Sequence, residues 1–225
     1  MHVVGYLLAS SHVRVVPLQP ETPLEEWCGE NGVPEAVSGG FAVKPEYVPL
    51  GELWVDGASA PHRPFRAPWS RQRAALIAGN GSVSIDHRHR LPERPERDLL
   101  QAGPLLVRDG RSAIAGADDP EGFSATAEEF DEDITADREP RLAVALTADA
   151  ILAVAADGRG PDDAGLTLWE FADVLVGLGA ERALNLDAGS AGVIISGGHR
   201  VNTPRDGEGA EMHPSSPAVN AIVFG

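Results

Sequence analysis

A single aspartate near the C-terminus has the surroundings that best suit catalysis. The segment "ERALNLDAGSAGVIIS" begins at Glu181; an apolar stretch reaches Asp187, and residues with small side chains follow it. A carboxylate at the end of a buried strand can stabilise positive charge or activate water. Small residues beside it let a ligand approach main-chain amides closely. The alternative is that Asp187 only braces a turn, as short polar residues after strands commonly do.

Other polar residues with useful spacing lie elsewhere in the chain. Asn185 precedes Asp187 by two positions, so both side chains face the same side of an extended strand. Asp157, in "ADGR", follows another apolar run and is either a second catalytic acid or a turn residue. His87 and His89 also alternate, but two histidines are a weak metal signal, and a solvated loop is the simpler interpretation. We therefore expect neither a metal nor a cofactor.

The elements that position these residues are clearest in the last third of the chain. The segment "RLAVALTADAILAVAADGR" has two apolar runs about a turn at Ala148–Asp149, which predicts a hairpin. In "LTLWEFADVLVGLG", Thr167 and Glu170 have the spacing of a capping box, and apolar residues recur every three or four positions. Gly179 is placed to end this helix. Strands are then expected in "RALNL", "GVIIS", "HRVN" and "AVNAIVF".

Strand and turn signals dominate the first half of the chain. Strands are expected in "HVRVVPL", "LGELWVDG" and "GPLLVRDG". In "RAALIAGNGSVSIDH", the pair Asn80–Gly81 predicts a tight hairpin, because both residues tolerate positive φ angles. The segment "PLEEWCGENG" predicts a short helix, with Thr22 as its N-cap and Pro23 at the first helical position.

These elements predict one domain over residues 1–225, of the α+β class, with a mixed, mainly antiparallel sheet and a few packed helices. The chain shows no internal repeat and no low-complexity linker. An acidic segment around residues 117–139 interrupts the pattern. An exposed insertion or a short acidic helix is the favoured interpretation of this segment, rather than a cation site.

Composition excludes several classes of protein. The formal net charge is −16 with a pI of about 4.7, which argues against a nucleic-acid partner, although a phosphorylated small substrate needs only one or two local cations. Cys28 is the only cysteine, so an intrachain disulfide is excluded. The chain has no stretch of about 20 apolar residues and no basic leader at its start. We expect a cytoplasmic protein that does not bind membranes; a homo-oligomer is left open.

The order of several short motifs resembles the phosphodiester glycosidase family. The motifs, spread from about Val13 to Phe224, include "AVSGGF", "LGELWVDG", "AGPLLVRDG", "EPRLAV", "ALNLDAGSAG", "VNTPRDG" and "AVNAIVF". Each motif alone is weak, but the ordered set is fairly specific. The resemblance implies hydrolysis of a sugar-1-phosphodiester, or of a related glycosidic bond, between the anomeric carbon and its leaving group. The implied partner is a small sugar phosphate or glycoside.

The resemblance also implies roles for individual residues. Asp187 is the expected main catalytic carboxylate, with Asp157 or Asp206 as a second. Arg141 is the expected phosphate ligand, because its planar guanidinium matches phosphate oxygens; a salt bridge is the alternative. A phosphodiester is a good leaving group, so an arginine or backbone N–H groups can replace a strong general acid. The other expected substrate-binding residues are Asn185, Gly39, Gly40, Gly189, Ser190, Asn202, Arg205 and Asn220.

The chain departs from the family pattern after Asp187, and two other hypotheses stand beside the hydrolase. Relatives carry three glycines and then hydroxyl residues, whereas this chain has "AGSAG". A homologue that binds a sugar or nucleotide-sugar without turnover is therefore one alternative. The other is an assembly protein whose acidic insertion contacts a partner.

Overall fold

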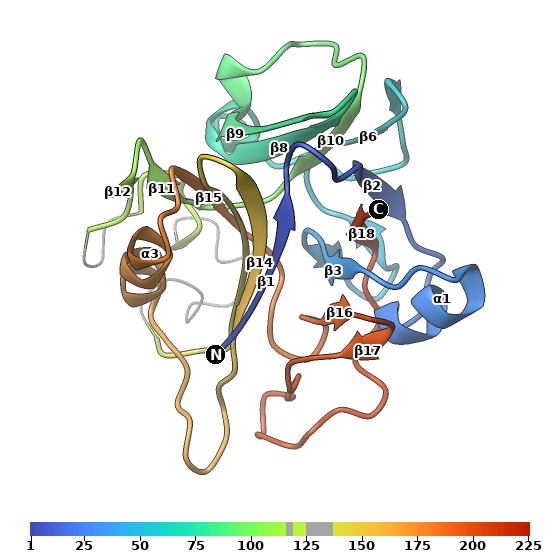
Figure 1. The fold of residues 1–225 in the computed structure, drawn as a ribbon, viewed down its shortest axis with the longest axis vertical. Helices are drawn as coiled ribbons and strands as arrows, with labels where there is room; N and C mark the ends of the chain where they lie inside the picture. Colours follow the sequence, from blue (N-terminus) through green and yellow to red (C-terminus); the bar gives the residue numbers. More distant parts are fainter. Residues whose placement is uncertain (116–118, 125–136) are drawn as a thin grey trace.

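Antiparallel sheets make up most of the regular structure (Figure 1). The computed structural model describes residues 1–115, 119–124 and 137–225. The strands are β1 (His2–Leu7), β2 (Val13–Pro17), β3 (Ala36–Ser38), β4 (Ala42–Val43), β5 (Val48–Pro49), β6 (Leu53–Val55), β7 (Ala58–Ser59), β8 (Ala74–Gly79), β9 (Ser82–His87), β10 (Asp98–Gln101), β11 (Leu105–Arg108), β12 (Arg111–Ser112), β13 (Arg141–Leu146), β14 (Ala150–Ala156), β15 (Arg182–Asn185), β16 (Ile194–Ser196), β17 (His199–Arg200) and β18 (Asn220–Phe224). The helices are α1 (Leu24–Asn31), α2 (Trp69–Gln72), α3 (Leu168–Gly177) and the short 3₁₀ helix η1 (Arg88–Arg90).

The predicted fold class is confirmed. Within the described ranges, every ladder between named strands is antiparallel, and a few helices pack on the sheets. The three larger sheets have the strand orders β1-β14-β13-β15-β11-β12, β7-β6-β10-β8-β9 and β17-β16-β3-β18-β2. Apolar side chains from all three contribute to one large core cluster, so the sheets enclose a shared interior.

The six-stranded sheet contains the hairpin predicted from the last third of the sequence. Its strands β13 and β14 pair from Arg141↔Ala156 to Leu146↔Ile151. Strand β15 then adds to the other side of β13, with Ala143 opposite Asn185. This arrangement brings the end of β15, and therefore the residues that follow it, beside the start of β13.

Helix α3 covers part of one face of this sheet (Figure 1). The predicted capping box is present: the Thr167 side chain accepts a hydrogen bond from the Glu170 N–H, and the Glu170 carboxylate accepts one from the Thr167 N–H. The buried stripe of the helix packs on small side chains of β13 and β15. The buried helix residues are Leu168, Phe171, Ala172 and Leu175.

The two other large sheets contain most of the turns predicted in the first half. Strands β8 and β9 form a hairpin whose turn residues Asn80 and Gly81 have φ angles of 53° and 71°. Helix α1 packs beside the sheet that contains β3 and β18 (Figure 1). Strand β3 leads directly into the short β4–β5 ladder, which is a separate two-stranded sheet.

The structure corrects two details at the N-terminal end. The sequence indicated no strand at His2–Leu7, yet β1 forms there and pairs with β14 along the edge of the six-stranded sheet. The prediction that Thr22 caps α1 was wrong. The N-cap is Pro23, which has an extended backbone, and no side chain caps the helix. The helix therefore begins one residue later than expected.

Two expectations concern the molecule as a whole. Most of the acidic segment around residues 117–139 lies outside the described residues, so its predicted exposure stays a prediction. No helix within the described ranges combines the length and the apolar character that crossing a membrane requires.

Candidate functional site

Asp187 lies where the six-stranded sheet meets the sheet that contains β3. The Leu186 N–H donates a hydrogen bond to the Leu142 carbonyl (2.8 Å), which extends the pairing of β15 with β13 by one residue. The next N–H, that of Asp187, instead donates to the Gly39 carbonyl at the end of β3 (3.0 Å). The backbone therefore fixes this carboxylate beside the Gly39–Gly40 segment.

The side-chain alternation of β15 gives Asp187 a polar setting. Leu184 and Leu186 belong to the central core, so Asn185 and Asp187 lie on the opposite face, beyond the part that α3 covers. Arg141 precedes Ala143 by two residues on β13, so it lies on this same face, near the end of the ladder at Ala143↔Asn185. The strand pair thus brings three predicted site residues to one end of one sheet face.

The charge state of Asp187 differs from that of an ordinary aspartate. Burial raises the pKa of its carboxyl group from 3.8 to about 6. The positive charge of Lys44 and a hydrogen bond from the Ala188 N–H oppose this shift. A carboxyl group with a pKa near 6 changes its protonation state close to neutral pH, which is a property of catalytic acids and bases.

Gly39 and Gly40 approach Asp187 because a buried asparagine holds them in place. The Asn220 side-chain oxygen accepts a hydrogen bond from the Gly40 N–H (2.7 Å). A Cβ atom at Gly39 would overlap with that same oxygen, so a larger residue does not fit without movement. Asn220, from β18, thus shapes the segment whose carbonyl group holds Asp187.

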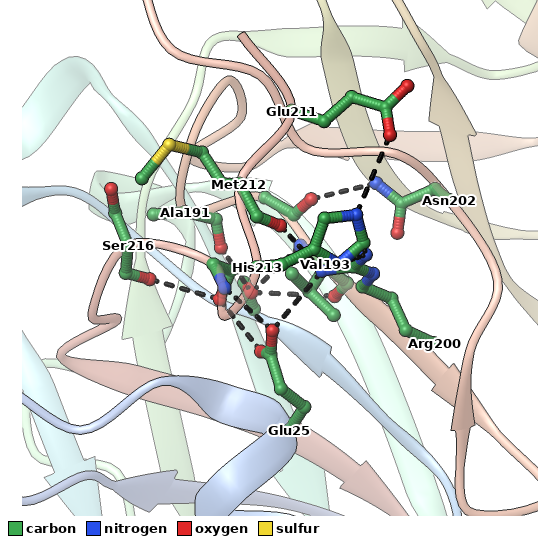
Figure 2. A network of polar contacts seen from close by, with 12 residues as sticks. Glu25, Ala191, Val193, Arg200, Asn202, Glu211, Met212, His213 and Ser216 are labelled. Atoms are coloured by element: carbon green, nitrogen blue, oxygen red, sulfur yellow. Dashed lines mark hydrogen bonds and ion pairs between the residues drawn. The ribbon is translucent and has the colours of Figure 1, made fainter.

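The loop that follows Asp187 is bound at several points. The Ser38 hydroxyl donates to the Ala191 carbonyl (2.7 Å) and accepts from the Val193 N–H (3.0 Å). The Asn202 amide donates to the Gly192 carbonyl (2.8 Å) and accepts from the Ile194 N–H (2.8 Å), within the network drawn in Figure 2. Ser38 therefore braces this loop.

The loop that follows Asp187 is also hydrogen-bonded, through Ser190, to the loop before β18. The Ser190 carbonyl accepts a hydrogen bond from the Ser216 N–H (2.8 Å). Figure 2 shows how Glu25 of α1 binds the same region: its carboxylate accepts bonds from the Ser215 N–H and hydroxyl, both at 2.7 Å, and from Arg200. Helix α1 thus anchors the loop that contacts the Asp187 segment.

Two arginines flank the Asp187 loop, and each is paired with an acid. The Arg159 guanidinium contacts the Glu139 carboxylate (2.5 Å) and lies 3.3 Å from the position of a Cβ at Gly189. Arg205 donates to the Gly209 carbonyl (2.9 Å) and contacts Glu211 (2.6 Å). Arg159 also has a left-handed backbone with φ 57°, a conformation that clusters at functional sites.

The other predicted acids contact nearby backbone groups. Asp157 contacts the His2 ring (2.6 Å) and accepts a hydrogen bond from the Thr203 N–H (2.9 Å), so it joins β1 to the 203–211 loop. Asp206 accepts bonds from the Glu208 N–H (3.0 Å) and the Ala210 N–H (2.8 Å), which shape its own turn. Whether either acid takes part in catalysis stays a prediction.

Arg141 and Asn185 are both buried, and both bind backbone carbonyl groups. The Arg141 guanidinium donates to the carbonyls of Leu166 (2.8 Å) and Asp137 (2.7 Å). The Asn185 amide donates to the Gly103 carbonyl (3.0 Å), and its buried side-chain oxygen accepts no hydrogen bond from any described residue. These contacts fix both side chains within the polar end of the sheet face.

Sequence reasoning missed two cations of this region: Lys44, whose charge acts on Asp187, and Arg159, which lies close to Gly189. Arg159 follows the "ADG" turn, and no short-range pattern links it to Gly189. Lys44 did leave a signal, because it is the only lysine among the 18 lysines and arginines of the chain. Among the described residues, no group of three or more metal-ligating side chains is arranged to hold an ion. The arrangement instead offers a carboxylate with a raised pKa, bare backbone and nearby cations.

Comparison with known proteins identifies the family and the fold. The model of the phosphodiester glycosidase family matches residues 31–224. A search among curated proteins finds no match. The structure resembles the catalytic domain of zebrafish N-acetylglucosamine-1-phosphodiester α-N-acetylglucosaminidase, solved in a form auto-inhibited by its pro-peptide, at 21% identity and a TM-score of 0.69. That alignment covers 94% of this chain and 72% of the zebrafish chain.

Two further structures share the fold. A hypothetical protein from Synechocystis aligns at 20% identity with a TM-score of 0.63, over 99% of this chain but only 58% of its own length. A Burkholderia pseudomallei K96243 protein described as exported aligns at 15% identity with a TM-score of 0.67, over 99% of this chain and 73% of its own. At these identities the likeness establishes the fold.

Proposed function

The chain belongs to the phosphodiester glycosidase family, and from this premise we propose that it hydrolyses a sugar-1-phosphodiester between the anomeric carbon and the phosphate. Membership in the family indicates a glycosidase-type hydrolase with a small carbohydrate-type substrate. The proposal adds the phosphodiester leaving group and the residues that act on it.

The observation that carries the proposal is the setting of Asp187. Its carboxyl group has a pKa of about 6, lies beside the Gly39–Gly40 backbone and experiences the charge of Lys44. In its ionised form, this carboxylate would stabilise the positive charge that develops at the anomeric carbon, or activate the attacking water. Asp157 and Asp206 are the candidates for a second carboxylate.

The nature of the leaving group explains why nearby positive charges and N–H donors can replace a general acid. A phosphodiester leaves as a stable anion, so it needs electrostatic stabilisation more than protonation. Arg141 begins the strand beside β15, Arg159 lies close to Gly189 of the loop after Asp187, and the Ala188 N–H donates a hydrogen bond to the Asp187 carboxylate. We propose that these groups hold the phosphate while Asp187 acts on the sugar.

A second candidate function is binding without turnover. It is favoured by one observation: Ala188 stands directly after Asp187, where the family pattern has a glycine. Its methyl group occupies space that bare backbone would leave to a ligand. A homologue that only binds a sugar or nucleotide-sugar would need no working carboxylate at position 187.

Release of free sugar from UDP-N-acetylglucosamine and from a panel of sugar-1-phosphodiesters tests the choice. We expect turnover by the wild-type protein and a loss of about 10³-fold in Asp187→Asn, since general acid–base groups commonly contribute 10²–10⁴-fold. Asp173→Asn, on the exposed side of α3, is the matched control and should stay active. Ligand-induced thermal stabilisation without any turnover would instead support the binding function.

A further inference from the structure

Lys44 occupies a special position next to the candidate site. It follows β4 directly, at the turn of the β4–β5 ladder, and its side chain is exposed. The segment that leads to it begins at Gly39, whose carbonyl group accepts the Asp187 N–H. The chain thus passes from the backbone that holds Asp187 to its only lysine within five residues.

The other cations near Asp187 already have partners. Arg159 is paired with Glu139, and Arg205 with Glu211. Arg141 donates to two backbone carbonyl groups. Across the described ranges, the Lys44 ammonium forms no hydrogen bond and no ion pair within 4.0 Å, unlike these arginines. The positive charge of Lys44 lowers the pKa of the Asp187 carboxyl group against the effect of burial, so the two groups lie within electrostatic range of each other.

The overall charge favours an additional, exposed cation to attract an anionic substrate toward the arginines and backbone N–H groups of the site. With a net charge of −16, the protein repels phosphates unless a local field reverses that effect. An arginine in an ion pair contributes little net charge, whereas an unpaired ammonium contributes one full unit. A lysine is also a compact charge on a flexible stem, which suits contact with a phosphate at varied positions.

We propose that Lys44 binds the phosphate of the leaving group and selects anionic over neutral leaving groups. This inference rests on the proposed function, because it names the residue that recognises the phosphate side of the substrate. Lys44 and Asp187 would then contact opposite sides of the bond that breaks: the ammonium would contact the departing phosphate, and the carboxylate the sugar.

Substrate pairs provide the kinetic test. We compare one sugar-1-phosphodiester with a neutral aryl glycoside of the same sugar, in wild-type, Lys44→Met and Lys44→Arg proteins. Lys44→Met should lose about 10- to 100-fold in kcat/KM on the phosphodiester, the range expected for a charge-assisted hydrogen bond, and only a few-fold on the glycoside. Lys44→Arg should recover most of the loss. Arg94→Met, an exposed cation in the loop before β10, controls for net charge.

The single lysine also permits a binding test that needs no turnover. Reductive methylation with ¹³C-formaldehyde keeps the charge and labels only Lys44 and the N-terminal amine, and the Lys44→Arg variant assigns the two NMR signals. Titration with inorganic phosphate should shift the Lys44 signal, and Asp187→Asn should leave that response in place. A matched titration with chloride at equal ionic strength separates phosphate binding from screening.

The outcomes of the two tests separate this inference from the proposed function. A selective kinetic loss, or a phosphate-specific shift in a protein without turnover, supports the role of Lys44; in the second case the proposed function fails by itself. Equal losses on both substrates in an active enzyme overturn the role of Lys44 and leave the hydrolase intact. A protein without turnover whose Lys44 signal responds equally to phosphate and chloride also overturns it.

Discussion

The sheet face that carries α3 has two ends of opposite character. Under the helix, Ala143, Ala145 and Ala183 pack in a dry cluster. Beyond the helix, on the same strands, the residues become Arg141, Asn185 and Asp187. The ladder passes from Ala145↔Ala183 to Ala143↔Asn185 without a break, so one strand pair supports both a core and a candidate site.

The difference between the two ends shows how one strand pair can be held rigidly by packing and still carry polar side chains. Small side chains let α3 pack closely on the ladder, which fixes β13 and β15. Where the helix begins, Arg141 binds the Leu166 carbonyl just ahead of it, so the polar end uses the backbone of the same helical region. The apolar end thus stabilises the strands, and the polar end bears the cost of a carboxyl group that burial disfavours when charged.

Removing the largest fully buried side chain at the apolar end should lower stability and leave catalysis unchanged. Phe171 is fully buried in the α3 cluster, so Phe171→Ala should lower the free energy of unfolding by about 3–5 kcal/mol. Urea denaturation measures this loss. Turnover per folded molecule should match the wild type, and Asp173→Ala on the exposed side of α3 is the control. A large fall in turnover of folded protein would contradict the separation of the two ends.

Crowding the polar end should affect both properties. In Gly39→Ala the new Cβ would overlap with the Asn220 oxygen, so we expect a loss of about 1–3 kcal/mol and reduced turnover, because the Gly39 carbonyl group holds Asp187. Gly29→Ala in α1 is the matched control, since nothing lies within 4 Å of its added Cβ. Unchanged turnover in Gly39→Ala would show that the position of Asp187 does not depend on this contact.

Neutralising Asp187 should stabilise the protein, with a defined pH dependence. Its pKa in the folded state, about 6, exceeds its ordinary value of 3.8, so the stability it contributes is full below pH 3.8 and is lost as pH rises through 6. At pH 8, Asp187→Asn should therefore exceed the wild type by about 1 kcal/mol, because partial solvent contact reduces the full effect. Near pH 4 the difference should vanish. Thermal unfolding at both pH values measures it, and a destabilised variant at pH 8 would contradict the raised pKa.

Local patterns predicted much of the fold. The Asn80–Gly81 turn, the capping box of α3 and the hairpin before it depend on neighbouring residues, and all three formed as predicted. Strand β1 did not follow from such a pattern. It depends on a partner about 150 positions away, with His2 opposite Ala155, and its sequence lacks clear alternation of polar and apolar residues.

Only part of the candidate site could be predicted from residues that are neighbours in the sequence. Asp187 and Asn185 share one short strand, so their common face followed from spacing alone. The position of Lys44 depends on how separate sheets meet, and that of Arg159 depends on two loops that leave different strands of one sheet. Neighbouring residues encode neither arrangement. Composition did single out Lys44 as the only lysine, although it gave no indication of where that lysine would lie.

The pH dependence of sugar release by the wild type and by Asp187→Asn tests the central claim most directly. If the ionised Asp187 carboxylate acts on the sugar, kcat/KM of the wild type should rise through an apparent pKa of about 6 and then level off. The Asn variant should show only residual turnover, without that rise. A variant that keeps both the rate and the rise would contradict the assignment of Asp187 as the catalytic carboxylate.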